Sequence, residues 1–190
     1  MDFEIEIIKF LQSGRNNFYD VSFQAITMLG SVLAVVLFAL FLFKFKHHLA
    51  VWYLVTYGFA ALVIAIVKAT VLRVRPFVAS EDIVLIGKVS SDFSFPSGHT
   101  ACAMAIAIFM GYFLFGHYKK AGARALIVIC LSMYVGLVGL SRMYLGAHYL
   151  TDVLAGAAIS AVICTSFILI LRHLNKKLRG KDYEIKDANE

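Results

Sequence analysis

The chain has 190 residues, of which 61% are hydrophobic and only 16% are charged. Soluble domains of this length are closer to half apolar, so the composition requires a hydrophobic solvent and excludes an ordinary soluble domain. A net charge of +6 would suit nucleic-acid binding. The basic residues, however, lie in short segments between long apolar runs, where they orient a membrane protein, and we therefore exclude nucleic acid as a partner.

Residues 2–12 predict a short amphipathic helix at the start of the chain. About eleven residues cannot cross a bilayer, because a spanning helix needs ~20. We interpret residues 1–25 as an amphipathic interfacial segment that lies in the membrane surface, and a hydrophobic lid over the site is the alternative. Four side chains share the apolar face at helical spacing: Phe3, Ile7, Phe10 and Leu11.

Five later segments are apolar and long enough to span a bilayer at about 1.5 Å of rise per residue, when their flanks snorkel to the surface. The sequence therefore predicts an all-α fold, a polytopic transmembrane helix bundle of about five spans plus the N-terminal interfacial helix. Residues 26–172 form the transmembrane domain, and residues 173–190 form a polar cytoplasmic tail. The predicted spans are about 26–43, 50–72, 100–116, 125–140 and 150–171.

The two sides of the predicted bundle differ in their basic residues. One side carries eleven Lys and Arg side chains, near residues 44–46 and 119–124 and in the tail, whereas the other carries seven. The positive-inside rule places the first side in the cytoplasm. The N-terminus, the 73–99 loop and the 141–149 loop then face outward, with tyrosines expected to anchor the outer membrane boundary: Tyr144 and Tyr149.

The cysteines and one pair of small residues give no evidence of a protein partner. Cys102, Cys130 and Cys164 lie inside apolar runs, and we expect small core side chains instead of a disulfide framework or a metal site. Gly156 and Ser160 form a small-xxx-small pair, which tight packing within the monomer explains better than dimerisation. We therefore infer no obligatory protein partner.

Three polar clusters remain once the scattered charges are set aside, and all three face outward. Each has a plain explanation by itself: basic side chains near span ends snorkel, a Pro-Ser-Gly run forms a turn, and a His–Asp pair at i and i+4 can be structural. Their convergence on one membrane face favours a site, because a carboxylate at a span boundary needs a partner. The clusters are Lys68 to Arg75-Pro76, Pro96-Ser97-Gly98-His99, and Ser141-Arg142 to His148 and Asp152.

The basic residues of these clusters suit a dianionic phosphate. Lys68 provides a point charge, while Arg75 and Arg142 provide planar, bidentate donors. Ser97 can add a hydroxyl donor, and Gly98 lets the backbone approach a ligand at the start of a helix, whose dipole favours an anion. Together they predict an anion-binding site that is built without a metal.

The histidines and the carboxylate of the clusters suit phosphoryl transfer. Asp152 lies one helical turn from His148 and can accept a ring N–H, which fixes the tautomer and leaves the other nitrogen free to attack phosphorus. His99 lies on the opposite wall and can protonate the leaving alkoxide. The set predicts a double displacement through a phosphohistidine, with no cofactor.

A metal-dependent alternative fits these residues less well. Glu81, Asp82 and Asp92 carry oxygen ligands of the kind that Mg²⁺ or Ca²⁺ binds, but they are scattered in a polar loop, and we interpret them as solvated charges. A zinc site formed by the two histidines and Asp152 would lie beside three basic side chains that repel a cation. We therefore predict no metal.

In this order and spacing, the three clusters resemble the three-part signature of the type 2 phosphatidic acid phosphatase family. The resemblance implies that His148 is the nucleophile, Asp152 its partner and His99 the general acid. It also implies magnesium-independent chemistry at the outer face of a bacterial plasma membrane. The substrate phosphate-binding residues that it implies are Lys68, Arg75, Ser97, Gly98 and Arg142, with Ser141 lining the site.

The family resemblance also suggests a substrate. Bacterial members of this size typically act on phosphatidylglycerophosphate, undecaprenyl diphosphate or phosphatidic acid, and we expect the first, with the other two as alternatives. The partners are then the lipid bilayer and the lipid phosphate substrate. Two rivals come from other classes. A vanadium-dependent haloperoxidase would use the same pocket but is soluble, and a non-enzymatic lipid-binding or transport protein would be expected to lack His148 or Asp152.

Overall fold

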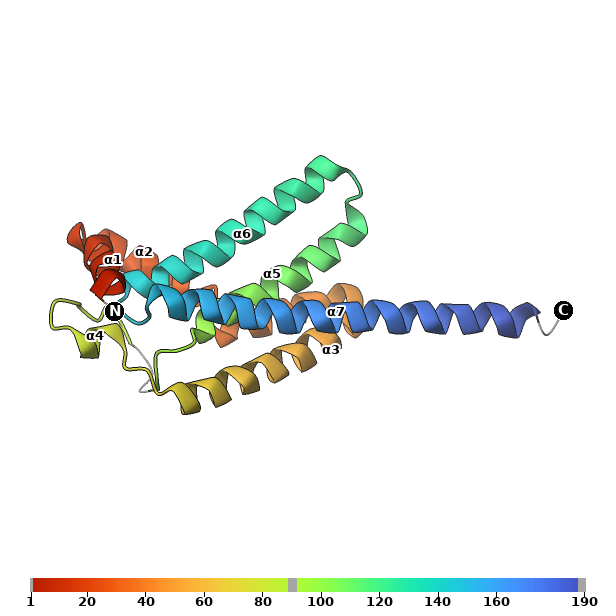
Figure 1. Cartoon of the computed structure of the whole chain (residues 1–190). Coiled ribbons are helices and arrows are strands. Elements are labelled where there is room, and N and C mark those ends of the chain that lie inside the picture. Colours follow the sequence, from red (N-terminus) through yellow and green to blue (C-terminus); the bar gives the residue numbers. More distant parts are fainter. Residues whose placement is uncertain (1, 89–91, 188–190) are drawn as a thin grey trace.

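The computed structural model describes residues 2–88 and 92–187, and within these ranges every regular element is a helix. Figure 1 shows long helices packed side by side, with short helices gathered at the end where the chain begins. This arrangement confirms the predicted all-α helix bundle. The elements are α1 (Asp2–Ser13), α2 (Asn17–Met28), α3 (Val32–Val71), α4 (Pro76–Ala79), α5 (Gly98–His117), α6 (Ala121–Tyr144) and α7 (Leu150–Asp187).

The first two predicted spans correspond to the two arms of α3, which bends at Lys46. The backbone angles of Lys46 (φ −153°, ψ 78°) are not helical, and Figure 1 shows the second arm running back toward the end from which the first arm came. The first arm begins at Val32, where Ser31 caps the helix. The prediction of a span from residue 26 is therefore wrong at its start, because residues 26–28 belong to α2.

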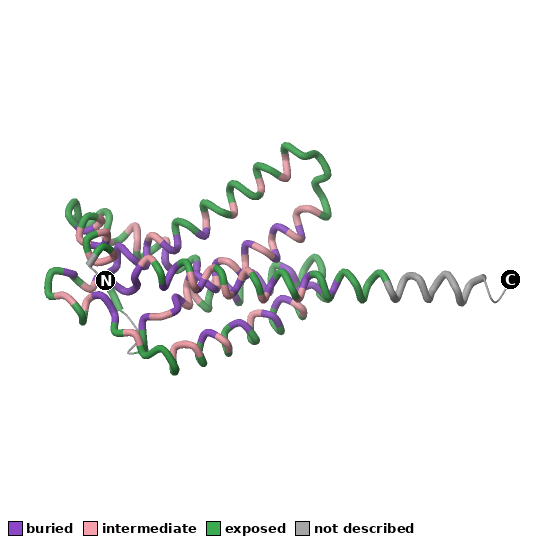
Figure 2. Tube along the Cα trace, viewed as in Figure 1, coloured by how far each residue is buried: buried purple, intermediate pink, exposed green. Residues whose placement is uncertain are grey.

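Within residues 2–88 and 92–187, four helices are long and apolar enough to cross a membrane, namely α3, α5, α6 and α7. With the arms of α3 counted separately, they correspond to the five predicted spans. Large apolar side chains such as Leu40, Leu126 and Val162 are exposed, and Figure 2 shows exposed positions along the outer sides of the helices. Such a surface is unfavourable in water, so the chain is a multi-pass membrane protein. Helix α7 continues into the predicted tail, whose residues 188–190 lie outside the described ranges.

Helix α5 lies at the centre of the bundle and contacts α3, α6 and α7. Small side chains on α7 let α5 and α7 pack closely against each other. The hydroxyl of Ser160 donates a hydrogen bond to the carbonyl of Ala101 (2.8 Å), and Gly156 lies directly against the backbone of Ser97. The pair of small residues therefore packs within the monomer, as predicted.

Helix α1 packs on the end of the bundle that is formed by the loops predicted to face outward. Ile8 is fully buried, and the side-chain amide of Gln12 donates hydrogen bonds to two backbone carbonyls at that end, those of Val84 and Tyr144 (2.8 and 2.7 Å). Part of the predicted apolar face points away from the protein, since Phe3 is 73% exposed and Phe10 is 77% exposed. The position of this helix in the membrane interface stays a prediction.

Tyr144 and Tyr149 are buried in the protein, so the prediction that they anchor the membrane boundary is wrong. The ring of Tyr144 stacks on Phe23 of α2 with centroids 4.2 Å apart, and its hydroxyl donates to Asp20 (2.7 Å). The ring of Tyr149 packs against the guanidinium of Arg73. Both rings hold the short helices and loops together, which is why they are withdrawn from the surface.

Replacing Gly156 by alanine should destabilise the fold, because a Cβ atom there would lie 2.3 Å from the carbonyl oxygen of Ser97 and push α7 away from the loop before α5. Overpacking of this kind costs ~1–3 kcal/mol. Thermal unfolding in detergent measures the effect. The control is Gly58→Ala, where a Cβ meets nothing within 4 Å, and its midpoint should be unchanged or slightly raised. Equal midpoints for both variants would contradict the close contact.

Candidate active site

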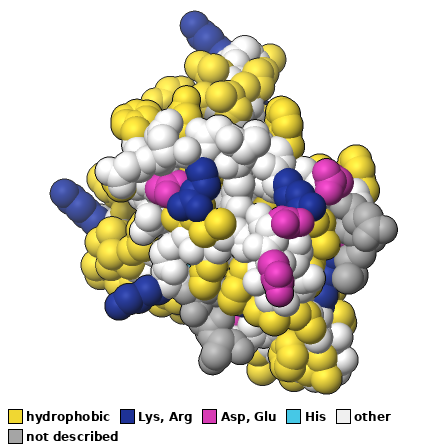
Figure 3. Space-filling model, turned by 90° about the vertical axis from the view of Figure 1, so that its left-hand side faces the viewer, with side chains coloured by type: hydrophobic (Ala, Val, Ile, Leu, Met, Phe, Trp, Pro, Cys, Tyr) yellow, Lys and Arg dark blue, Asp and Glu magenta, His cyan; other side chains and the backbone are white. Residues whose placement is uncertain are grey.

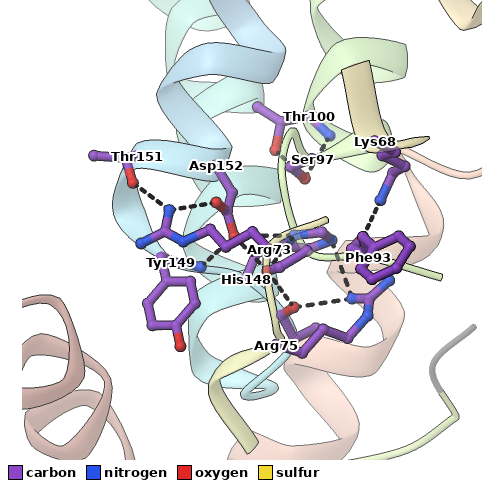
Figure 4. Close-up of polar contacts among 12 residues, drawn as sticks. Lys68, Arg73, Arg75, Phe93, Ser97, Thr100, His148, Tyr149, Thr151 and Asp152 are labelled. Carbon is purple, nitrogen blue, oxygen red and sulfur yellow. Dashed lines mark hydrogen bonds and ion pairs between the residues drawn. The ribbon is translucent and has the colours of Figure 1, made fainter. Parts of the chain in front are cut away.

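The three predicted clusters meet at the end of the bundle that carries α1, α2 and α4. Lys68 lies in the last turn of α3, Arg75 precedes α4, and residues 96–99 lead into α5. His148 lies between α6 and α7, and Asp152 lies in the first turn of α7. Figure 4 shows side chains from these separate elements converging. Figure 3 views the same end, where basic and acidic side chains lie next to one another among apolar atoms.

His148 and Asp152 form the predicted pair, and both side chains are buried. The Nδ1 atom of His148 lies 3.5 Å from Oδ2 of Asp152. The opposite ring nitrogen, Nε2, lies 3.4 Å from a terminal nitrogen of Arg75. His148 therefore presents one nitrogen to a carboxylate and the other to a cation that can hold an anion.

Three further groups hold the carboxylate of Asp152. Its Oδ2 accepts hydrogen bonds from the hydroxyl of Ser94 and from the backbone N–H of Tyr149 (2.9 Å), and its Oδ1 accepts one from Arg73 (2.6 Å). Neither Ser94 nor Arg73 was predicted to be a site residue. A signal for Arg73 existed, because it lies two residues before Arg75 in an extended segment, where alternate side chains point the same way.

The basic side chains of Lys68 and Arg75 bind Asp92, so the interpretation of Asp92 as a solvated loop charge is wrong. The Nζ atom of Lys68 lies 2.9 Å from Oδ2 of Asp92 and also donates to the carbonyl of Phe93. Arg75 donates to Oδ1 and to the backbone carbonyl of Asp92. The carboxylate neutralises two cations that would otherwise repel each other.

Arg142 is buried, and one of its donors has no partner in the part of the chain that the structure describes. One terminal nitrogen donates to the hydroxyl of Thr27 in α2 (3.0 Å), whereas its Nε has no hydrogen-bond partner among the described residues. An unpaired donor on a buried cation is unfavourable, so this nitrogen marks a place where an anionic ligand can bind. Nothing in the sequence pattern indicated the role of Thr27.

Ser97 and Ser141 are fully buried and have structural partners. Ser97 caps α5, since its Oγ accepts hydrogen bonds from the backbone N–H and the hydroxyl of Thr100 (3.4 and 3.0 Å). The hydroxyl of Ser141 donates to the carbonyl of Val138 (2.6 Å). A Cβ at Gly98 would meet nothing within 4 Å, so the start of α5 has room for a ligand. The phosphate-binding roles of these three residues stay predictions.

His99 lies in the first turn of α5 and lines an apolar cavity of about 210 Å³. The charges of Arg142, His148, Arg75 and Asp92 all act on His99, so it belongs to the same group of side chains. The cavity lies between α5 and the two arms of α3. Its other lining residues include Gly30, Tyr57, Ala61, Gly98 and Cys102.

Burial and charge set the protonation of the loop residues in the site. Burial lowers the pKa of His148 to about 4, and the neighbouring arginines act in the same direction, while Asp152 opposes them. Burial alone would raise the pKa of Asp92, but the hydrogen bonds from the two cations that it binds lower the pKa to about 2. At neutral pH His148 is therefore an uncharged base with a free lone pair, and Asp92 is ionised.

The described residues contain no cluster of three or more histidine, cysteine or acidic side chains that could hold a metal ion. Asp82 pairs instead with Lys9 of α1 (2.7 Å). A cation in the site would also meet the positive charges of Lys68, Arg75 and Arg142. The prediction of metal-free chemistry rests on this charge pattern and stays a prediction.

The fold and the site together define a class of protein, a multi-pass helix bundle with a histidine–carboxylate pair beside an anion site made of arginine and lysine. The sequence profile of the PAP2 superfamily matches residues 49–176, a range that contains every residue of the three clusters. The chain belongs to the PAP2 superfamily. This finding confirms the family resemblance that the motifs carry.

Two curated relatives come from Bacillus subtilis (strain 168). The chain is 34% identical over 111 residues to phosphatidylglycerophosphatase B, a match that covers 58% of this chain and 52% of that protein. It is 37% identical over 134 residues to undecaprenyl-diphosphatase BcrC, which covers 68% of this chain and 63% of that protein. The chain thus spans between half and two thirds of the length of these two relatives.

Two crystal structures share the fold. A transmembrane PAP2-type phosphatidylglycerolphosphate phosphatase from Bacillus subtilis matches with a TM-score of 0.76 at 26% identity, over 93% of this chain and 86% of that one. LpxE from Aquifex aeolicus matches with a TM-score of 0.70 at 27% identity, over 86% of this chain and 93% of that one. Both similarities support the transmembrane bundle described above.

The burial of an uncharged His148 should make the fold less stable in acid. The pKa of His148 is lower in the folded chain than the usual 6.5. The contribution of this side chain to the free energy of unfolding is therefore complete above about pH 6.5 and is lost as the pH falls toward 4. Thermal unfolding in detergent, from about pH 7.5 to about 4.5, measures it. The midpoint should decline less steeply in His148→Gln, whereas His47→Gln, at an exposed histidine, should keep the wild-type slope. Identical slopes in all three proteins would refute this account.

Proposed function

We propose that this protein is a metal-independent lipid phosphate phosphatase whose substrate is phosphatidylglycerophosphate. The proposal rests on the position of His148 next to two arginine side chains that can bind an anion. Its Nε2 faces Arg75 at 3.4 Å, and the Nε of Arg142 is buried with no hydrogen-bond partner among the described residues. A phosphate held by these two arginines would lie in front of a nucleophilic ring nitrogen, with its oxygens replacing the Asp92 carboxylate on Lys68 and Arg75.

The first displacement transfers the phosphoryl group to the enzyme. The Nε2 lone pair of His148 attacks phosphorus and the bond to the lipid alcohol breaks. His99, which takes up a proton when the phosphate dianion is bound beside it, donates that proton to the departing alkoxide. Asp152 stabilises the positive charge that develops on the imidazole ring. The bound cations stabilise the charge on the phosphoryl oxygens.

The second displacement hydrolyses the phosphohistidine. Water attacks phosphorus while His99, which is now neutral, accepts a proton from that water. The N–P bond breaks, its electron pair returns to His148, and inorganic phosphate leaves. Both histidines are then back in their starting protonation states, so water is the only co-reactant that the balance requires.

Two observations support a lipid substrate. The names of the two curated relatives refer to phosphatidylglycerophosphate and to undecaprenyl diphosphate. The apolar cavity adjoins His99, where the lipid alcohol would leave, and it is lined by Ala61 and Cys102 of the membrane helices. A hydrocarbon chain can therefore extend from the headgroup between α3 and α5. Undecaprenyl diphosphate and phosphatidic acid are the alternative substrates.

We place the active site on the extracytoplasmic side of a bacterial plasma membrane. The bend of α3, the connection from α5 to α6 and the C-terminal part of α7 lie at the opposite end of the molecule (Figure 1) and hold eleven basic residues. At the site end, several basic side chains are bound to carboxylates, which reduces their free charge. They are Lys9, Arg15, Lys68, Arg73 and Arg75. The excess of basic residues at the end opposite the site favours a cytoplasmic position for that end.

The purified protein in detergent should release inorganic phosphate from phosphatidylglycerophosphate in the presence of EDTA, with vanadate as a competitor. His148→Ala removes the nucleophile and Asp152→Asn disturbs its tautomer, so each should lower kcat by ~10³–10⁴-fold. Phosphate release measured on phosphatidylglycerophosphate, undecaprenyl diphosphate, phosphatidic acid and a water-soluble phosphomonoester would test the reaction and rank the substrates. The control is His47→Ala, at an exposed histidine of the α3 bend.

Each outcome of this assay bears on a separate part of the proposal. Full activity of His148→Ala would falsify the phosphohistidine mechanism, and activity abolished by EDTA would restore the metal-dependent alternative. A higher kcat/KM for one of the other two lipids would transfer the substrate assignment to that lipid. Equal rates on the lipids and on the soluble ester would argue against lipid recognition.

Labelling of single cysteines in intact cells should show which side of the membrane the site faces. In a background without Cys102, Cys130 and Cys164, an impermeant thiol reagent should modify Lys88→Cys, which lies at the site end, and should not modify Lys119→Cys, which follows α5. Permeabilised cells provide the control in which both positions react. The reverse pattern in intact cells would place the site in the cytoplasm.

A further inference from the structure

Arg73 connects the predicted catalytic pair to the N-terminal helix. Its Nη1 donates hydrogen bonds to Oδ1 of Asp152 and to the hydroxyl of Thr151 (2.6 Å each), and its Nη2 donates to Oε2 of Glu4 in α1 (2.7 Å). Its guanidinium lies over the ring of Tyr149, with Cζ 3.9 Å from the ring centroid. Figure 4 shows Arg73 between Asp152, Thr151 and Tyr149. These contacts hold the guanidinium in one orientation.

The two oxygens of Asp152 have different partners. Oδ2 accepts hydrogen bonds from Ser94 and from the backbone N–H of Tyr149, and it is the oxygen that faces His148. Among the described residues, Oδ1 accepts a hydrogen bond from Arg73 alone. An unpaired oxygen on a fully buried carboxylate is strongly unfavourable. Arg73 is therefore the described group that satisfies Oδ1 while Oδ2 faces His148.

Glu4 holds Arg73 from the opposite side. Its Oε1 accepts hydrogen bonds from the backbone N–H and the hydroxyl of Thr151 (2.8 Å each), while its Oε2 binds Arg73. Burial raises the pKa of Glu4, but the hydrogen bonds from Thr151 and Arg73 lower the pKa below its usual value. Glu4 is therefore ionised at neutral pH, and α1 contributes a fixed negative charge behind Asp152.

We propose that Arg73 is a positioning residue for the phosphatase reaction, and that α1, through Glu4, completes the support of Asp152. This inference rests on the proposed function. Within the part of the chain that the structure describes, every side-chain hydrogen bond of Arg73 goes to Asp152, Thr151 or Glu4. Its effect therefore reaches the substrate through Asp152 and His148. The N-terminal helix then has a part in the chemistry, in addition to any role as a membrane anchor or a lid.

Loss of Arg73 should reduce turnover more than substrate affinity. The freed Oδ1 of Asp152 would take up a proton at a higher pH than in the wild type, and His148 then loses its ionised partner. The acid limb of the kcat/KM profile should therefore move to higher pH. The charged or titratable groups that act on His148 are Arg75, Arg142, His99 and Asp152, and all of them stay in place in this variant.

The experiment compares variants of Arg73 and of Glu4 in phosphate release from phosphatidylglycerophosphate. Arg73→Gln should lower kcat by ~10–100-fold, the usual effect of removing a group that orients a catalytic one, with KM changed less than about twofold. Arg73→Lys should recover part of the loss, because it restores the charge but not the planar fork. Glu4→Gln keeps an acceptor for Thr151 but loses the ion pair with Arg73, so its loss should be smaller and in the same direction.

A matched control is available in the same helix. Lys9 of α1 pairs with Asp82 (2.7 Å) and with Glu6 (3.4 Å), and these carboxylates lie outside the site. Lys9→Met therefore removes a tether of α1 and leaves Glu4 and Arg73 bound to each other. Its kcat, KM and pH profile should equal those of the wild type. Thermal unfolding of every variant shows whether the fold is intact, and Glu4→Gln serves as the test if Arg73→Gln fails to fold.

The outcomes separate this proposal from a structural role and from the proposed function. An increased KM at unchanged kcat in Arg73→Gln, a pH profile identical to the wild type, or the same loss in Lys9→Met as in Glu4→Gln would each overturn the positioning role. Histidine NMR titration in detergent, with the His148 signal assigned by its loss in His148→Gln, provides a readout without turnover. If the wild-type protein hydrolyses none of the lipids, the proposed function fails, and a His148 titration that is unchanged in Arg73→Gln would still refute the positioning role.

Discussion

The fully buried carboxylate of Asp152 is the constraint on which the rest of the site depends. An ionised carboxylate away from water is stable only when donors that are themselves held in place satisfy its oxygens. Here the donors come from the loop before α5 (Ser94), from the residue before α7 (Tyr149) and from the segment after α3 (Arg73). In the backbone, the N–H of Ser97 donates to the carbonyl of Asp152 (2.9 Å). The loop that carries the proposed nucleophile and the loop that leads into the proposed general acid are therefore joined at this one residue.

The long helices could be predicted from the sequence because apolar length is a property of each segment by itself. The turn between the first two predicted spans coincides with the bend of α3 at Lys46. The separate helix α2 was less accessible, since the apolar character of a segment does not report where one helix ends and the next begins. Local chemistry did carry part of that information: Ser31 caps α3, Asn16 caps α2, and the polar run at 44–48 coincides with the bend at Lys46. The contact of Gly156 with Ser97 could be anticipated as close packing, but its partner could not, because spacing within one helix does not identify the neighbour.

The motif residues of the candidate site were accessible because their chemistry is unusual in a membrane span. Asp92 was misinterpreted for the opposite reason, since a carboxylate in a polar loop is usually solvated and its partners Lys68 and Arg75 precede it by many residues. Arg73 was counted as one more basic residue of the outward loops, and only the folded arrangement shows it between Glu4 and Asp152. Sequence spacing thus predicted the members of each motif and their convergence, but the individual contacts that join one motif to another are visible only in the fold.

The charge balance of the site explains why a loop carboxylate lies on the predicted phosphate-binding residues. Lys68, Arg75 and Arg142 bring three cations together at one end of a membrane bundle, where repulsion is weakly screened. Asp92 binds two of them, yet its side chain remains 41% exposed, so it neutralises charge without being enclosed. A phosphate dianion brings more negative charge and more acceptor oxygens, and a half-exposed ion pair is worth only ~0–1 kcal/mol, so the carboxylate can turn to water when phosphate binds. The same balance disfavours a metal cation, and it fits the phosphorylated lipid that we propose as the ligand.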